Sequence, residues 1–221
     1  MRHVSRRLTA ALVVVRAWQG SGFAFTLAIG LAGFALVPSR PVPVPGREGV
    51  SSLLWPLVPV LPALAVPQVA GVVYREIERV SGKSSLGTRL GCAAIITSLL
   101  GLFCLAGWRF DLSVLCRNAA FLLGVALAGT VFSPSGAWLP VTVIPMVMWL
   151  IGTQPGGAVD PWAILLLPGS ASGAARASYL VWITGTGFWL MSRRDAGGLR
   201  CHLALRSRVR VRARGGPRPP R

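Results

Sequence analysis

The chain is dominated by apolar stretches that are each about as long as a lipid bilayer is thick. A helix needs roughly 17 to 25 mostly apolar residues to cross the hydrocarbon layer. Four stretches meet or approach that length, namely residues 20–37, 51–73, 90–106 and 174–191. Only 13% of the residues are charged, about half the fraction found in soluble domains. We therefore predict a polytopic integral membrane protein of the all-α class.

A longer apolar region, residues 112–152, lies between the third and fourth of these stretches. It is too long for one crossing, and the Ser-Pro-Ser-Gly cluster at residues 133–136 is typical of a tight turn. We predict two shorter helices here, over residues 112–132 and 137–152. This gives a helical bundle of about six transmembrane helices within residues 20–191. A re-entrant pair in place of the two shorter helices is the main alternative.

The basic residues are distributed unequally between the two sides of the membrane that these helices would cross. Eighteen of the 23 fall in three segments, with four in residues 1–19, four in residues 74–89 and ten in residues 193–221. The other five lie in segments that six crossings place on the opposite side: Arg40, Arg47, Arg109, Arg117 and Arg176. Segments rich in Lys and Arg stay in the cytoplasm during insertion. We predict a multi-pass protein of the bacterial plasma membrane with both termini in the cytoplasm.

Both ends of the chain are expected to lie along the membrane surface. Residues 1–19 combine basic residues with a short apolar run and are typical of an amphipathic surface helix, with cleavage as a secretory signal as the alternative. Residues 192–221 are predicted to be a disordered, Arg-rich cytoplasmic tail. Near anionic lipid each basic side chain gains roughly 1 kcal/mol, so we expect this tail to bind membrane lipids and not nucleic acid. The predicted lipid-binding residues are Arg206, Arg208, Arg210, Arg212 and Arg214.

The segment between the second and third stretches has mixed charge. Arg75, Glu76, Glu78 and Arg79 lie on a short helical stretch. Glu76 and Arg79 are three residues apart and can pair on one helix face. The segment is either a solvated turn or a docking surface for another protein.

Two apolar segments are expected to depart from a regular helix. Residues 51–73 contain four prolines, each of which removes a backbone donor and clashes with the preceding turn. We predict a kinked or partly unwound helix there, which either lines a pathway or packs as a bent helix. Residues 160–168 are far too short to cross, and they form either a short helix that dips into the outer leaflet or a loop that rests on it.

Polar and small residues near the helix ends suggest simple structural roles. We expect five polar residues to lie at outer helix ends, where they can snorkel toward the headgroups: Arg109 with Asp111, Arg117 with Asn118, and Arg176. An outward basic cluster that attracts an anionic substrate is the alternative. Small residues such as Gly124 and the cluster at 184–187 are expected to let helix backbones approach closely.

The residue types of most catalytic and metal sites are missing from the predicted membrane interior. The spans contain no Asp, Glu or His in their interior, which argues against a proton relay. The four cysteines lack metal-binding spacing; Cys116 is the one thiol expected to be exposed to oxidation, and alone it cannot form a bridge. A Walker motif is absent because Ile77 stands where its first glycine is required. We predict no enzyme activity, no cofactor and no metal.

The order of these parts resembles the membrane subunits of ABC-2-type ATP-binding-cassette exporters. The shared parts are a surface helix at the N-terminus, six spans, a cytoplasmic helix after the second span and a short apolar segment before the last. The resemblance covers roughly residues 8–191. It implies a connecting helix over Leu8 to Trp18, an ATPase-docking helix over Arg75 to Val80 and a re-entrant element over Trp162 to Pro168. The chain is short for the family, and its proline-rich second span departs from the family pattern.

The resemblance implies a permease-like subunit driven by a separate ATP-binding-cassette ATPase. Such a subunit pairs with a second copy of itself or with a similar permease. Its ATPase-docking residues are then Arg75, Glu76, Glu78 and Arg79. A non-transporting membrane scaffold or assembly protein with a lipid-binding tail is the alternative from another functional class.

Overall fold

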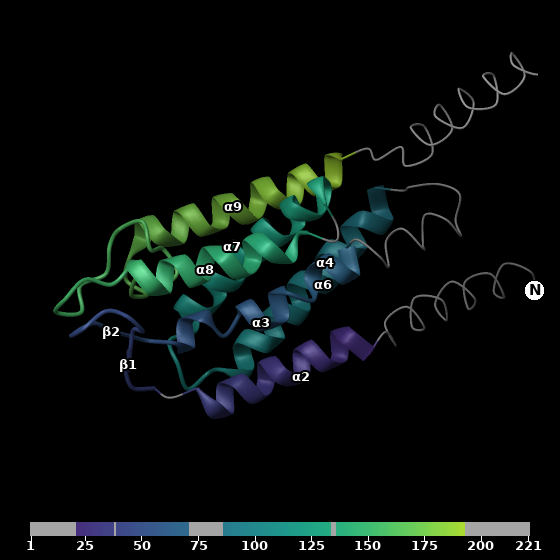
Figure 1. Ribbon diagram of the computed structural model, residues 1–221. Helices are drawn as coiled ribbons and strands as arrows, with labels where there is room; N and C mark the ends of the chain where they lie inside the picture. The colour runs from purple at the N-terminus through teal and green to yellow at the C-terminus, as the bar shows by residue number, and fades with distance from the viewer. Residues whose placement is uncertain (1–20, 38, 71–85, 134–135, 193–221) are drawn as a thin grey trace, which may run out of the picture. The chain divides into compact units, whose positions relative to one another are not determined.

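The computed structural model describes residues 21–37, 39–70, 86–133 and 136–192. Most of these residues are helical, which confirms the predicted predominance of helix (Figure 1). The helices are α2 (Ser21–Leu36), α3 (Val60–Ala63), α4 (Val66–Gln68), α6 (Leu86–Ala106), α7 (Leu112–Phe132), α8 (Trp138–Ile151) and α9 (Ser172–Met191). Between α2 and α3 lie an antiparallel hairpin of β1 (Val42–Pro43) and β2 (Ser51–Ser52), and the 3-10 helix η1 (Trp55–Leu57).

Helices α6 and α7 form a hairpin of two long apolar helices. Each has 21 residues, or about 31 Å at 1.5 Å per residue, which matches the thickness of the hydrocarbon layer. The mean hydropathy is 1.9 over Arg89–Ala106 and 1.7 over Leu112–Phe132, so both helices are long and apolar enough to cross a membrane. Asp111 begins α7, because its side chain accepts hydrogen bonds from the backbone N–H groups of Ser113 and Val114.

Helices α2, α8 and α9 occupy the positions of three further predicted spans. They have 16, 14 and 20 residues. A helix of 14 residues is about 21 Å long, shorter than the hydrocarbon layer, so the number of crossings and the re-entrant alternative for α7 and α8 stay predictions. The turn predicted between α7 and α8 is confirmed, since the Gly136 N–H donates to the Ser133 carbonyl oxygen at 3.1 Å.

The predicted second span is broken into short pieces inside the bundle. In place of one kinked helix, its described part forms β2, η1, α3 and α4, because each proline lacks an N–H and interrupts the backbone hydrogen bonds. Helix α3 contacts α2, α6, α7 and α8, and Ala63 and Ala65 have no exposed surface. Other helices therefore enclose the irregular backbone, which favours the bent packing segment over one that lines a pathway.

Apolar side chains cover the outside of the bundle as well as its inside. In α8, Val141 and Met148 are buried, whereas Val143, Met146 and Val147 are 46%, 52% and 41% exposed. The outer faces of α2, α6 and α9 also carry large exposed apolar residues, among them Ile29, Leu31, Leu90, Ile95, Leu102, Leu105, Leu180, Ile183 and Phe188. A surface helix of a soluble domain is polar on its outer face. Outer faces of this composition suit contact with lipid or with other apolar helices.

Helices α7 and α9 cross with their backbones in contact. A Cβ atom added to Gly185 would lie 2.7 Å from the carbonyl carbon of Gly124, and one added to Gly124 would lie 2.6 Å from the carbonyl carbon of Val181. Both distances are far below van der Waals contact, so a side chain at either position forces the helices apart. The expected role of these small residues in close helix packing is confirmed.

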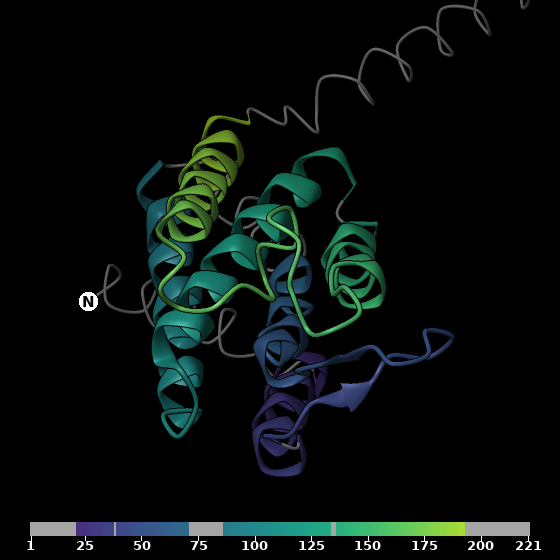
Figure 2. The same ribbon diagram turned by 90° about the vertical axis from the view of Figure 1, so that its left-hand side faces the viewer.

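The connections between the helices gather at two ends of the bundle. Residues 39–54, 107–111 and 152–171 lie at one end, which we call the loop end (Figure 1, Figure 2). The turn between α7 and α8 and the beginning of α6 lie at the other end. Helices α6, α7, α8 and α9 therefore run in alternating directions through the bundle.

Candidate functional site at the loop end

Two sets of predicted site residues lie outside the described part of the chain. The predicted ATPase-docking set falls within residues 71–85, and the predicted lipid-binding set falls within residues 193–221. The two sets are Arg75, Glu76, Glu78 and Arg79, and Arg206, Arg208, Arg210, Arg212 and Arg214. The connecting helix expected over Leu8 to Trp18 also lies outside. Of the elements that the resemblance implies, the described residues include the segment from Trp162 to Pro168.

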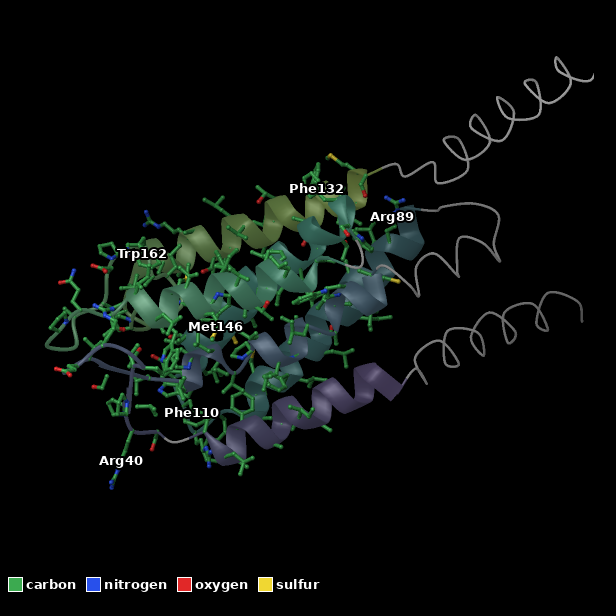
Figure 3. The ribbon with its side chains drawn as sticks, viewed as in Figure 1. Arg40, Arg89, Phe110, Phe132, Met146 and Trp162 are labelled. Carbon is green, nitrogen blue, oxygen red and sulfur yellow. The ribbon has the colours of Figure 1, made fainter. Side chains whose placement is uncertain are left out.

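That segment is a partly buried loop, so of the two alternatives for residues 160–168, a short helix or a loop, the structure shows the loop. Residues 160–168 form successive turns, one of which is closed by the Leu166 N–H donating to the Ala163 carbonyl oxygen at 2.9 Å. Ala163 and Leu165 have no exposed surface, while Trp162 is 44% exposed at the loop end (Figure 3). The apolar side chains of the loop therefore pack into the end of the bundle.

Arg117 of α7 reaches across to the backbone of this loop. Its guanidinium donates hydrogen bonds to the carbonyl oxygens of Leu167 at 2.8 Å and Pro168 at 3.0 Å. The Nε atom donates to the Oδ1 atom of Asn118 at 3.1 Å. One cation thus hydrogen-bonds two successive carbonyls of a non-helical segment, and the Pro168 carbonyl also accepts from the Ala171 N–H at 3.1 Å.

Asn118 ties the same loop to the broken second span. Its Nδ2 atom donates to the Leu165 carbonyl oxygen at 2.7 Å and to the Pro56 carbonyl oxygen at 2.8 Å. Two neighbouring side chains of α7 thus connect three segments that are far apart in the sequence. We call Arg117 and Asn118 the loop anchor.

The loop anchor corrects the prediction that these two side chains snorkel outward. Arg117 is 2% exposed and Asn118 is fully buried. An unbonded carbonyl in an apolar interior is costly, and a guanidinium offers five donors in a fixed fork. The attraction of Asp111, six residues earlier, adds to these contacts. The sequence signal for the anchor is an adjacent Arg-Asn pair inside an apolar helix, because such groups persist only with specific partners.

Other arginines donate to the carboxyl ends of three helices. None of α2, α8 and α9 has a basic residue in its last turn. The donors come from other elements, and the donor and acceptor pairs are Arg47 to Leu150 at 3.1 Å, Arg89 to Leu190 at 3.0 Å, and Arg109 to Phe34. These bonds satisfy the final carbonyls of each helix or of its cap and oppose the negative end of its dipole. Arg89 does so at the end of the bundle opposite to Trp162 (Figure 3).

Asp111 is the acidic group beside the loop anchor. Its Oδ1 atom accepts hydrogen bonds from the Ser113 hydroxyl at 2.6 Å and from the Ser113 backbone N–H at 2.9 Å. The hydroxyl bond above all holds the pKa of Asp111 below its usual range. A Cβ atom added to Gly169 would collide with Asp111 and with Ser113, so the loop passes directly against the N-terminus of α7.

An apolar cavity of about 170 Å³ lies between α6, α7 and α9. Its lining includes Leu100, Cys104, Cys116, Tyr179 and Trp182, and the indole N–H of Trp182 is buried without a hydrogen-bond partner. A more open groove of about 730 Å³ runs between α7, α8 and α9 beside the crossing of Gly124 and Gly185. The residues that line the two cavities are uncharged, so both spaces suit apolar groups.

The polar side chains described at the loop end hydrogen-bond to backbone carbonyls of the bundle. Within residues 21–37, 39–70, 86–133 and 136–192, no group of three or more His, Cys, Asp or Glu side chains could hold a metal ion. No protein-family model, curated protein or solved structure matches the chain. Its function is therefore inferred from the sequence and the geometry.

Proposed function

We propose that the chain is an integral membrane protein whose helical bundle is the permease-like subunit of an ATP-driven exporter. The observation that carries the membrane part is the apolar outer surface of the bundle, together with two helices long enough to cross. Exposing apolar surface to water is unfavourable by about 25 cal/mol per Å². A lipid environment removes that cost for α2, α6, α8 and α9 alike.

The proposed orientation places the loop end outside the cytoplasm. The segments on that side carry five basic residues, against 18 on the side of the two termini. Arg47, Arg109 and Arg117 of the outer set donate hydrogen bonds to backbone carbonyls of the bundle. These arginines have structural partners, which explains why the outer side carries them.

The exporter part of the proposal is supported by the order of elements. A mixed-charge segment follows the broken second span, and a short apolar loop precedes the last helix, as in the membrane subunits of ABC-2-type exporters. The cavities of the described residues are apolar, so an apolar or amphipathic cargo fits them better than an ion does. In this proposal Arg75, Glu76, Glu78 and Arg79 contact the ATPase.

A pull-down from the native host in mild detergent tests the exporter proposal. We expect the tagged chain to recover an ATP-binding-cassette ATPase, identified by mass spectrometry. Recovery should be lost in the double charge reversal Arg75→Glu, Arg79→Glu, because the docking surface changes sign. The matched control is Arg176→Glu, an exposed arginine at the start of α9 on the opposite side, which should leave recovery unchanged.

Two results would contradict the proposal. One is the absence of any such ATPase under conditions that preserve a known exporter complex. The other is recovery that survives the double reversal but is lost when residues 206–221 are deleted. The second result would favour the scaffold, whose basic tail binds the partner.

A further inference from the structure

Two free thiols from different helices meet in the cavity between α6, α7 and α9. Cys104 stands near the end of α6 and Cys116 near the start of α7, and both line the cavity. Their side chains lie close enough to interact with each other, and both thiols are free. The short connection over residues 107–111 reverses the chain, so thiols twelve residues apart become neighbours.

This pair corrects the expectation that Cys116 is a single thiol without a partner. Cys104 and Cys116 belong to different predicted spans, and no spacing rule for sequences relates them. The antiparallel packing of α6 on α7 brings them together. The pair is therefore a property of the tertiary structure.

A reagent can reach the pair through Cys116. Cys116 is partly exposed, whereas Cys104 is 1% exposed. The cavity volume of about 170 Å³ is close to that of an apolar cavity of about 150 Å³ that binds benzene. Because the lining is apolar, a neutral aromatic group enters more readily than an ion does.

We propose that Cys104 and Cys116 form a redox-reactive dithiol that closes to a disulfide by exchange with a small neutral disulfide. The new bond ties the end of α6 to the start of α7, one residue before the loop anchor. The site does not depend on the exporter function proposed above. Both thiols are carried by α6 and α7, and α9 completes the cavity around them.

The exchange proceeds in two balanced steps. The sulfur of Cys116 attacks one sulfur of the reagent disulfide and loses its proton to water, which forms a mixed disulfide and releases the first reagent thiolate. The sulfur of Cys104 then loses its proton and attacks the sulfur of Cys116, which releases the second reagent thiolate. The thiolates take up the two protons. In total the pair gives two electrons and two protons to the reagent, which is reduced to two thiols.

The composition of the cavity favours a disulfide over a metal. Structural metal sites that use thiolates have four ligands, and the described residues offer no group of three or more ligating side chains around the pair. A disulfide is uncharged, so its formation leaves no charge in an apolar space. In the proposed orientation the loop end also faces the compartment where disulfides persist.

The test uses the full chain in lipid nanodiscs with 2,2′-dithiodipyridine, a neutral aromatic disulfide whose reduction product absorbs light. The background variant is Cys92→Ala, Cys201→Ala, which leaves only the pair. Further substitution with Cys104→Ala or Cys116→Ala gives single-thiol controls. Intact-mass spectrometry follows the protein, and absorbance counts the released thiopyridone.

We expect the pair to release two equivalents of thiopyridone and to lose two hydrogens in mass, without a lasting mixed disulfide. The Cys104→Ala control should release one equivalent and keep the pyridyl adduct on Cys116. A persistent adduct on the pair would overturn the proposal, because the thiols would then not meet. Thiols that react only after unfolding of the nanodisc-embedded chain would overturn it as well, because the cavity would then be closed to the reagent.

Discussion

A buried guanidinium is stable in an apolar bundle only when its N–H groups have acceptors. At Arg117 the acceptors are loop carbonyls and the side chain of Asn118. The loop depends on Arg117 in turn, because the Leu167 and Pro168 carbonyls accept hydrogen bonds from its guanidinium. Arg117 therefore helps to hold the segment 160–168 in the end of the bundle, together with Asn118, which donates to the Leu165 carbonyl.

Replacing Arg117 by methionine should release this loop. Arg117→Met keeps the length of the side chain but removes every donor, and a buried carbonyl left without a partner costs about 1 to 3 kcal/mol. We expect a lower midpoint of thermal unfolding and faster hydrogen–deuterium exchange in residues 160–168. The control Arg176→Met changes an exposed arginine and should alter neither. Unchanged exchange in Arg117→Met would show that packing alone holds the loop.

Asp111 gives the start of α7 a defined dependence on pH. Its folded-state pKa is lowered chiefly by the Ser113 hydroxyl bond, so the stability that the carboxylate adds is present in full above its unfolded pKa of about 3.9. That stability is lost as the pH falls through the lower folded pKa. Asp111→Asn keeps a capping oxygen but cannot titrate. The difference in thermal midpoint between the wild type and Asp111→Asn should therefore shrink below about pH 4. A difference that stays constant into acid would contradict this assignment.

Proline and glycine shape the elements of this bundle in opposite ways. The prolines of the second span divide it into η1, α3 and α4, and the surrounding helices enclose the pieces. Glycine instead keeps α7 and α9 whole and lets them touch at Gly124 and Gly185. Close contact between helix backbones gains packing that lipid cannot replace.

A single methyl group at Gly185 should weaken the contact between α7 and α9. Gly185→Ala places a Cβ atom against the backbone of Gly124, and such overpacking costs about 1 to 3 kcal/mol. Gly187 lies on the same helix, where an added Cβ meets nothing within 4 Å. Gly187→Ala should therefore be neutral or stabilising by up to about 1 kcal/mol. Thermal unfolding in detergent compares the two variants, and equal midpoints would argue against the close crossing.

The whole molecule presents two ends with different connections, and their sidedness can be measured directly. In a cysteine-free background, Gln154→Cys marks the loop end and Ser133→Cys marks the opposite end, both at exposed positions. We expect a membrane-impermeant maleimide to label Gln154→Cys on intact cells and Ser133→Cys only after lysis, because the basic segments stay inside. The reverse pattern would invert the proposed orientation. Labelling of both on intact cells would exclude a membrane between the two ends.

The amino-acid sequence by itself determined where the helices of this protein lie. Length and composition placed the boundaries of α2, α7, α8 and α9 within two residues of the bounds observed, because long apolar runs end where Gly, Pro, Asp and Ser begin. The disruption of the second span also followed from its prolines, since a missing N–H acts locally. Helix bounds and disruption by proline both depend on the local sequence of a segment and not on its neighbours in the fold.

Only the tertiary structure decided which polar groups meet. Arg117 faces loop carbonyls about fifty residues away in the sequence, and Cys104 lies beside Cys116 because the turn between α6 and α7 sets their register. A side chain near the end of an apolar helix can reach outward to the headgroups or inward to a backbone group, and its own sequence neighbourhood is the same in both cases. Whether the side chain points outward or inward depends on whether another segment brings carbonyl groups within reach. Only the folded structure brings such a segment close.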